Sequence, residues 1–311
     1  MAQKNRHQFQ GAVEVKDTSG NGEAEFEIMN QVPFRRSSGR YYLEEFFSQR
    51  PALNAVINTA YSNADATNSA NTAIRLAEKV ANRNFETLGT NATTALVTFS
   101  ATRAAITLTT AGADGDQIII LPHLDSAQSA WAESARWGSE NSVEWECAIS
   151  TASSIADMAI WAGLKKTNTQ AFATDSDQVY FAYDATSSSD VGALDGTGHA
   201  TTWQIIVSSG GADYVTSTDV TVAASSIYRF RIAIDSDRKA SAWINDKQYV
   251  LEQVASTGTS GLGTTTELGQ GKSVALADNI DLVPYVGVMD NAGAAKAIDL
   301  HYEKISRILF E

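Results

Sequence analysis

The sequence is poor in the residue types that mark disulfide scaffolds and metal sites. Cysteine occurs once in 311 residues, at Cys147, so no disulfide can form within the chain. Cys147 lies in a strand-like run, 143–149, which predicts a buried and unreactive thiol. Proline occurs only four times. The four histidines are far apart and do not have metal-ligand spacing: His7, His123, His199 and His301.

Long apolar runs are also absent. No run approaches the roughly 18 residues that cross a bilayer, so we expect no membrane span. Residues 1–10 lack the apolar core of a secretory signal peptide. We therefore expect a chain that is made in a cytoplasm and not exported by its own leader.

Basic residues are fewer than acidic residues, and the difference is unevenly distributed along the chain. The formal net charge is −13, yet residues 1–100 carry ten basic and ten acidic groups. Residues 101–311 carry 13 basic groups against 26 acidic ones, so the whole net charge belongs there. An acidic body keeps itself soluble and repels phosphates, which argues against nucleic acid as a partner.

The clearest structural pattern is the stretch 227–251, which reads as three strands joined by two turns. Its first run alternates apolar and polar residues with a period of two, as a half-buried strand does. The second strand, 240–244, places Ala242 and Ile244 on one face and Trp243 on the other. Such a meander cannot bury its apolar face alone, so it requires a second sheet.

From residue 95 onward the remaining runs also read as strands, ten or more without an intervening helical period. This predicts a mainly β sandwich, jelly roll or barrel. Four tryptophans fall within strands and are predicted to fill the core: Trp145, Trp161, Trp203 and Trp243. The Gly/Thr-rich segment 257–272 and the segment 186–202 are candidate binding loops.

Residues 1–50 are predicted to form an extended N-terminal arm. The arm ends in a stretch dense in aromatic residues and arginine, the types enriched where proteins dock. The alternative is that these aromatic side chains pack on the main domain. The candidate docking residues are Phe34, Arg35, Arg36, Arg40, Tyr41, Tyr42, Phe46 and Phe47.

Residues 51–90 are predicted to form one helix and a join. Pro51 suits the first turn of a helix, which would run from Ala52 to about Phe85. Apolar and small residues then recur at spacings of four and three, a weak coiled-coil pattern. The helix either forms an oligomeric stalk, most simply a trimer, or lies against the β domain. The seam residues are Leu53, Ile57, Ala60, Ala64, Thr67, Asn71 and Ile74.

Three pieces of the last 170 residues resemble the concanavalin A-like lectin/glucanase jelly roll. They are VEWECAI with IADMAIWAGL, the meander YRFRIAIDSDRKASAWINDKQYV, and the closing VPYVGVMD and AIDLHYEKISRI. More narrowly, ANRNFETLGTN, DGDQIIILPHLDS and LHYEKISRILFE are similar to structural proteins of marine tailed bacteriophages. The resemblance covers residues 80–311. It implies a virion component that displays a jelly-roll domain, 91–311, and assembles in the host cytoplasm.

Catalytic and metal-binding patterns are weak. Glucanases of the resembling fold use a Glu-x-Asp-x-x-Glu strand, and this spacing does not occur here. Glu144 and Glu146 share a face of one strand and are expected to be solvent-facing. The Asp-x-Asp pairs at 114–116, 175–177 and 235–237 are expected to form turns rather than calcium sites.

The sequence therefore favours a non-enzymatic virion protein without cofactor or metal. The favoured role is a capsid decoration protein that binds the major capsid protein or another virion protein through its N-terminal region. The alternative is a tail-fibre or head-fibre protein that binds a host-surface glycan.

Overall fold

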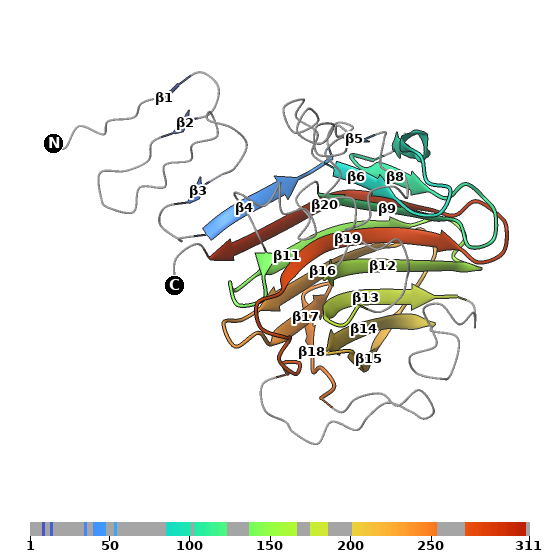
Figure 1. Cartoon of the computed structure of the whole chain (residues 1–311). Coiled ribbons are helices and arrows are strands. Elements are labelled where there is room, and N and C mark those ends of the chain that lie inside the picture. The colour runs from blue at the N-terminus through green and yellow to red at the C-terminus, as the bar shows by residue number, and fades with distance from the viewer. Residues whose placement is uncertain are drawn as a thin grey trace, which may run out of the picture.

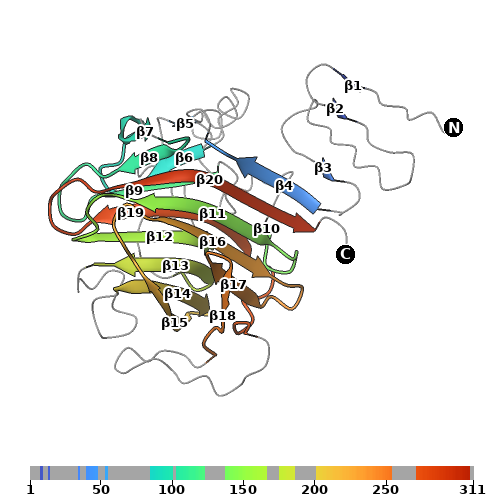
Figure 2. The ribbon, with the colours of Figure 1, turned by 180° about the vertical axis from the view of Figure 1, so that it is seen from behind.

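The chain folds into two large antiparallel sheets that pack face to face (Figure 1; Figure 2 shows the same from behind). The computed structural model describes residues 40–47, 85–100, 103–122, 137–166, 175–185, 201–253 and 271–308. It also describes the backbone of short strands at 8–9, 13–14, 34–35 and 53–54. This two-sheet architecture confirms the predicted mainly β sandwich.

The first sheet is called the β12 sheet. Its strand order is β15-β14-β13-β12-β19-β9-β6-β5, and β10 also pairs with β19. The strands are β15 (Ala212–Thr221), β14 (Thr202–Ser209), β13 (Gln178–Asp184), β12 (Met158–Lys165), β19 (Asp281–Asp290), β9 (Gln117–Pro122), β6 (Phe85–Leu88), β5 (Leu53–Asn54) and β10 (Trp137–Gly138).

The second sheet is called the β11 sheet. Its order is β18-β17-β16-β11-β20-β4-β3, and β8 pairs with both β20 and β7. The strands are β18 (Lys247–Tyr249), β17 (Ala240–Ile244), β16 (Ile227–Ile234), β11 (Glu144–Thr151), β20 (Ala297–Ile308), β4 (Arg40–Glu45), β3 (Phe34–Arg35), β7 (Val97–Phe99) and β8 (Ile106–Thr109). A separate hairpin consists of β1 (Gln8–Phe9) and β2 (Val13–Glu14).

The meander folds as the sequence predicts. Asp235 accepts a hydrogen bond from the backbone N–H of Lys239 and so closes the first turn. Asn245 and Asp246 both have positive φ angles, 48° and 67°, as a two-residue type I′ hairpin requires. Ala242 and Ile244 face the core, whereas Trp243 points outward.

The main core lies between the sheets, and alternate residues of each strand enter it. Three of the four predicted core tryptophans are at most 1% exposed: Trp145, Trp161 and Trp203. Trp203 packs edge-on against Phe230, with ring centroids 4.7 Å apart. The prediction that Trp243 fills the core is wrong. Trp243 alternates on β17 with the inward-facing Ala242 and Ile244, so it faces outward, and its ring lies under the Arg231 guanidinium.

The two outer faces differ. Every residue of β12 and β13 is buried, so the centre of the β12 sheet is covered on both sides in the folded chain. Trp161 belongs to a second apolar cluster on that outer face, where it stacks on Tyr285. On β16 of the β11 sheet, by contrast, exposed and buried residues alternate. The β11 sheet therefore presents its outer face to solvent.

The prediction of a helix from Ala52 to about Phe85 is wrong at both ends. Leu53–Asn54 is strand β5, and Phe85 begins strand β6, with which β5 pairs in parallel. Phe85 is 2% exposed and packs on Phe47, so tertiary packing outweighs the weak local helix signal. Residues 55–84 lie outside the described residues.

Helical structure in the described part of the chain is limited to the three-residue 3-10 turn η3 (Thr94–Leu96). No helix there is long and apolar enough to cross a bilayer.

Strand β4 ties the predicted arm to the end of the chain. It pairs with β20 over six residues, from Arg40 opposite Ile308 to Glu45 opposite Glu303. In both views β4 lies beside the C-terminal half of β20 (Figures 1 and 2). Phe47, which follows β4, is fully buried in the core. The end of the arm is thus an integral part of the sandwich.

Candidate functional site

The candidate site is the outer face of the β11 sheet around one row of cross-strand neighbours. The register places Trp243 beside Arg231, Arg231 beside Glu146, Glu146 beside Lys304, and Lys304 beside Glu44. The row therefore crosses β17, β16, β11, β20 and β4. We call this row, with the adjacent residues Glu144, Tyr302, Arg229 and Phe46, the charged face.

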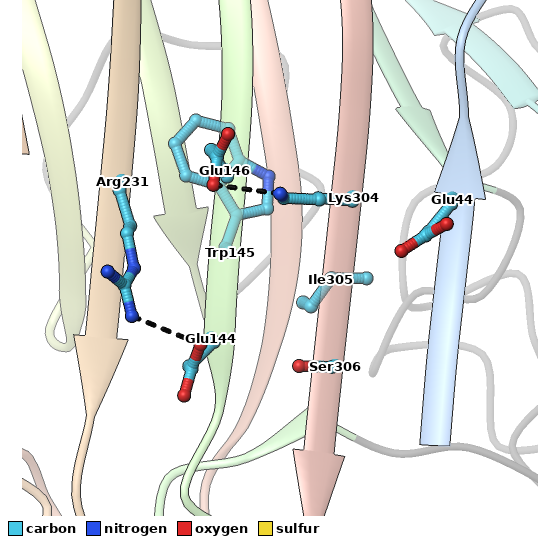
Figure 3. A pocket seen from close by; sticks show the side chains of 8 residues that line it. All are labelled: Glu44, Glu144, Trp145, Glu146, Arg231, Lys304, Ile305 and Ser306. Carbon is cyan, nitrogen blue, oxygen red and sulfur yellow. Dashed lines mark hydrogen bonds and ion pairs between the residues drawn. The ribbon is translucent and has the colours of Figure 1, made fainter. Parts of the chain in front are cut away.

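Ion pairs connect the strands across the charged face (Figure 3). The Lys304 ammonium lies 2.9 Å from a carboxylate oxygen of Glu146. Arg231 lies 3.3 Å from Glu144, and Arg40 approaches the same carboxylate to 3.7 Å. These side chains are partly exposed, so each pair contributes little stability, and their main effect is to hold the side chains in place.

Glu146 is held in its ionised form. Partial burial alone would raise its pKa, but hydrogen bonds from Tyr302 and Lys304 outweigh burial, and the pKa lies below its ordinary value. The Tyr302 hydroxyl donates to Glu146 at 2.5 Å, and burial together with this bond raises the pKa of Tyr302. A carboxyl with a lowered pKa is a poor general acid at neutral pH.

A shallow pocket of about 450 Å³ lies within the charged face. Its charged lining comes from four strands, and Figure 3 shows Arg231 directed toward Glu144 and Lys304 directed toward Glu146. The lining residues are Glu44, Glu144, Trp145, Glu146, Arg231, Lys304, Ile305 and Ser306.

Aromatic rings flank the pocket. Phe46 is 59% exposed, and its ring centroid lies 6.0 Å from that of Tyr302. On the opposite side, the Arg231 guanidinium lies 4.7 Å from the centroid of the Trp243 ring. Exposed rings beside charged groups are typical of binding surfaces.

The structure separates the candidate docking residues. Phe34 and Arg35 form β3, at the edge of the β11 sheet; Arg40, Tyr41 and Tyr42 lie on β4. The Arg40 guanidinium donates to Ser306 Oγ at 3.0 Å and to the carbonyl of Ser142 at 2.8 Å, so it also fixes β4 to the body. Phe46 is exposed, whereas Phe47 is a core residue, as the alternative interpretation of the aromatic stretch predicted.

Several predicted positions lie outside the described residues. They include Arg36 of the docking set and all of the seam residues except Leu53, which is in β5. Most of the two candidate binding loops, 186–202 and 257–272, is also outside. Trp203, at the border of the first loop, is fully buried.

A buried carboxyl lies directly behind the charged face. Glu303 is 3% exposed and accepts a hydrogen bond from the Trp145 indole at 2.9 Å, whereas its second oxygen has no partner. Burial raises the pKa of Glu303 to about 7. Cys147, its neighbour on β11, is also buried, as predicted, and burial raises its pKa. Sequence reasoning missed Glu303, because its inward direction depends on a bulge.

The bulge occurs where the register of β11 and β20 shifts, between Ala148 and Ile149. There His301 Nε2 lies 2.5 Å from Ser150 Oγ, and Asp299 is directly opposite Ser150. The trio resembles a nucleophilic constellation, yet Ser150 is only 1% exposed and Asp299 accepts hydrogen bonds from Thr107 and Ser100 instead. Ser150 is therefore not accessible to a substrate, and the contact links the two strands at the bulge.

The Asp-x-Asp segments 114–116 and 235–237 contain turns, as expected, whereas 175–177 is a bend whose Asp177 bonds to distant segments. Asp116 accepts hydrogen bonds from the Asn91 amide and the Ala113 N–H. Asp177 accepts the N–H groups of Gly210 and Ala277. Among the described residues there is no group of three or more His, Cys, Asp or Glu side chains that could hold a metal.

No protein-family model and no curated protein matches the chain. Among solved structures, alginate lyase A1-II′, a member of polysaccharide lyase family 7, is 12% identical with a TM-score of 0.43, and the match covers 69% of this chain and 84% of the lyase. A protein of unknown function from Shewanella oneidensis MR-1 is 11% identical (TM-score 0.44, 86% of each chain). The potassium-bound carbohydrate recognition domain of Emp46p is 7% identical (TM-score 0.41, 80% of this chain and 97% of that one). Likeness at this level says nothing about activity or ligand.

Proposed function

We propose that this chain is a non-enzymatic structural protein of a tailed-bacteriophage virion, most simply a capsid decoration protein. Its docking residues, toward other virion proteins or toward sister copies, lie on the charged face and in the N-terminal region. The virion assignment rests on the sequence resemblance. The docking role rests on one structural observation: β4, the end of the Arg- and aromatic-rich arm, is a strand of the β11 sheet and supplies residues to the charged face.

The chemistry of the charged face supports binding rather than catalysis. Glu144 and Glu146 are each held by cations, and the lowered pKa of Glu146 disfavours proton donation. The nearby carboxyl with a raised pKa, Glu303, points into the core, where a substrate has no access. We therefore propose that the chain has no glycosidase or lyase activity.

Co-sedimentation with particles of the encoding phage tests the docking role. The full chain should sediment with particles that lack it. A chain without residues 1–39 keeps β4 but lacks the rest of the arm. We therefore expect it to bind the particles at least roughly tenfold more weakly than the full chain. Phe46→Ala should also weaken binding, whereas Phe99→Ala, which removes a comparably exposed ring (46%) from β7, should not. Equal binding by all four proteins would contradict the proposal.

A glycan-binding role is the second candidate, and the flanking rings favour it. Phe46, Tyr302 and Trp243 surround a pocket rich in hydrogen-bonding groups, which is a suitable surface for a sugar chain. A glycan array tests this candidate: we expect hits that Phe46→Ala abolishes. No signal above background would remove it.

A further inference from the structure

The charged face is locally neutral although the molecule is strongly acidic. Its three carboxylates, Glu44, Glu144 and Glu146, are matched by its three cations, Arg229, Arg231 and Lys304. The chain as a whole carries a net charge of −13, so copies of it repel each other over most of the surface. The charged face is a region where two copies can approach without that cost.

The order of charges along the central row is self-complementary. From β16 to β4 the row reads Arg231, Glu146, Lys304, Glu44, so its signs alternate. Consider a two-fold axis that runs along the strands between β11 and β20. This axis places Glu146 over Lys304 of a second copy, and Arg231 over Glu44 of that copy. All four residues then face opposite charges.

The neighbouring row is complementary in the same arrangement. In register order it contains Arg229 on β16, Ala148 on β11 and Tyr302 on β20, with Phe46 beside Tyr302 at the far end. The same axis brings Phe46 over Arg229 of the second copy. A guanidinium over an aromatic ring is attractive, and the contact would cover the most exposed large apolar side chain of this face.

We propose that the charged face is an interface between two copies of this chain, related by a two-fold axis along β11 and β20. This interface rests on the docking role proposed above and deepens it, because it names a second copy as the partner of the charged face and leaves the N-terminal region to bind the virion. The two β11 sheets would stack about 10 Å apart with nearly aligned strands, as sheets of a sandwich do. Isologous pairing of this kind is the commonest symmetry of soluble homo-oligomers.

Charge reversal followed by mixing tests the pairing directly. Arg231→Glu would place a carboxylate opposite Glu44 of the second copy, and Glu44→Arg would place a guanidinium opposite Arg231 of that copy. Each variant alone should therefore change from two chains to one in light scattering of the full chain at micromolar concentration. Mixing the two variants restores opposite charges at both positions and should restore the mass of two chains. Restoration also shows that both variants are folded.

The matched control is Asp237→Arg, the same kind of charge reversal on an exposed turn away from the charged face. It should leave the dimer intact. The proposal is overturned if the wild-type chain is monomeric, if either variant keeps the wild-type mass, or if the mixture remains monomeric. Particle binding by the monomeric Glu44→Arg variant separates the two proposals. If this variant still binds particles, the virion role stands without the dimer. If the wild-type chain forms dimers but binds no particles, only the interface stands.

Discussion

At the scale of single residues, the most informative side chain is a carboxyl inside an apolar core. Glu303 faces Cys147 on β11 and Glu45 on β4, and the neighbouring core residues Phe47 and Ile305 are apolar. One of its oxygens has only the Trp145 indole as partner, and the other has none. Ionisation of this group therefore costs free energy in the folded state.

We predict that Glu303→Gln flattens the pH dependence of stability. The folded pKa is about 7 against an ordinary value of 4.5, so between these values the folded chain holds more protons than the unfolded chain. The contribution of Glu303 to the free energy of unfolding should consequently fall as the pH rises from 5 to 8, by about 2 to 3 kcal/mol. Glutamine keeps the acceptor for Trp145 and cannot ionise. Urea unfolding at several pH values measures this, and parallel profiles for the two proteins would contradict it.

His301, two residues away, should act with the opposite sign. Burial lowers its pKa below 6.5, so the stability it contributes is present above that pH and is lost as the pH falls. His301→Gln should reduce the loss of stability on acidification below about pH 6.5. A variant that acidification destabilises as much as the wild type would show that the bulge does not depend on the neutral imidazole.

At the scale of elements, β4 decides how the arm relates to the body. Phe47 anchors the end of β4: its ring is fully buried and lies 5.3 Å from that of Phe85. Arg40 anchors the beginning through Ser306 and Ser142. Two anchors at opposite ends explain how a six-residue strand near a sheet edge is held in one register.

We predict that Phe47→Ala destabilises the folded chain by about 3 kcal/mol or more, because a fully buried ring is lost and a cavity remains. Phe46→Ala is the adjacent control and should change stability by less than about 0.5 kcal/mol, since Phe46 is mostly exposed. Urea denaturation of both variants tests whether β4 is integral. Similar small effects would mean that β4 detaches without disturbing the core.

The elements show which features could be predicted from sequence. The period of two and the turn residues at 235–238 and 245–246 are local, so the meander was predictable. The partners of β4 and β11 were not, because Arg40 and Ser306 are separated by 266 positions and no local pattern encodes such a pairing. The helix prediction failed at Leu53 and Phe85 for the related reason that pairing between distant segments outweighs propensity.

The candidate site likewise combines features that local sequence patterns predict with contacts between distant strands that they do not. Glu144 and Glu146 were predictable as residues of one strand face, whereas the docking role of Arg40 and Phe46 stays a prediction. That they meet Arg231 and Lys304 on one surface follows from the strand order alone. The inward position of Glu303 depends on a one-residue bulge at His301, which reverses the face of every residue that follows.

At the scale of the whole molecule, the two sheets have different roles. The central strands β12 and β13 of the β12 sheet are buried on both faces. The β11 sheet is open and carries the charged face, and its strand β4 and edge strand β3 belong to the N-terminal region. A molecule built this way suits attachment by one side while its acidic remainder faces outward.

The proposed place of this chain in a virion is tested most directly by quantitative mass spectrometry of density-gradient-purified particles of the encoding phage. A virion component should be present at a constant ratio to the major capsid protein in every particle fraction. Recovery of the chain only from the soluble lysate, with none in the particles, would contradict the virion role.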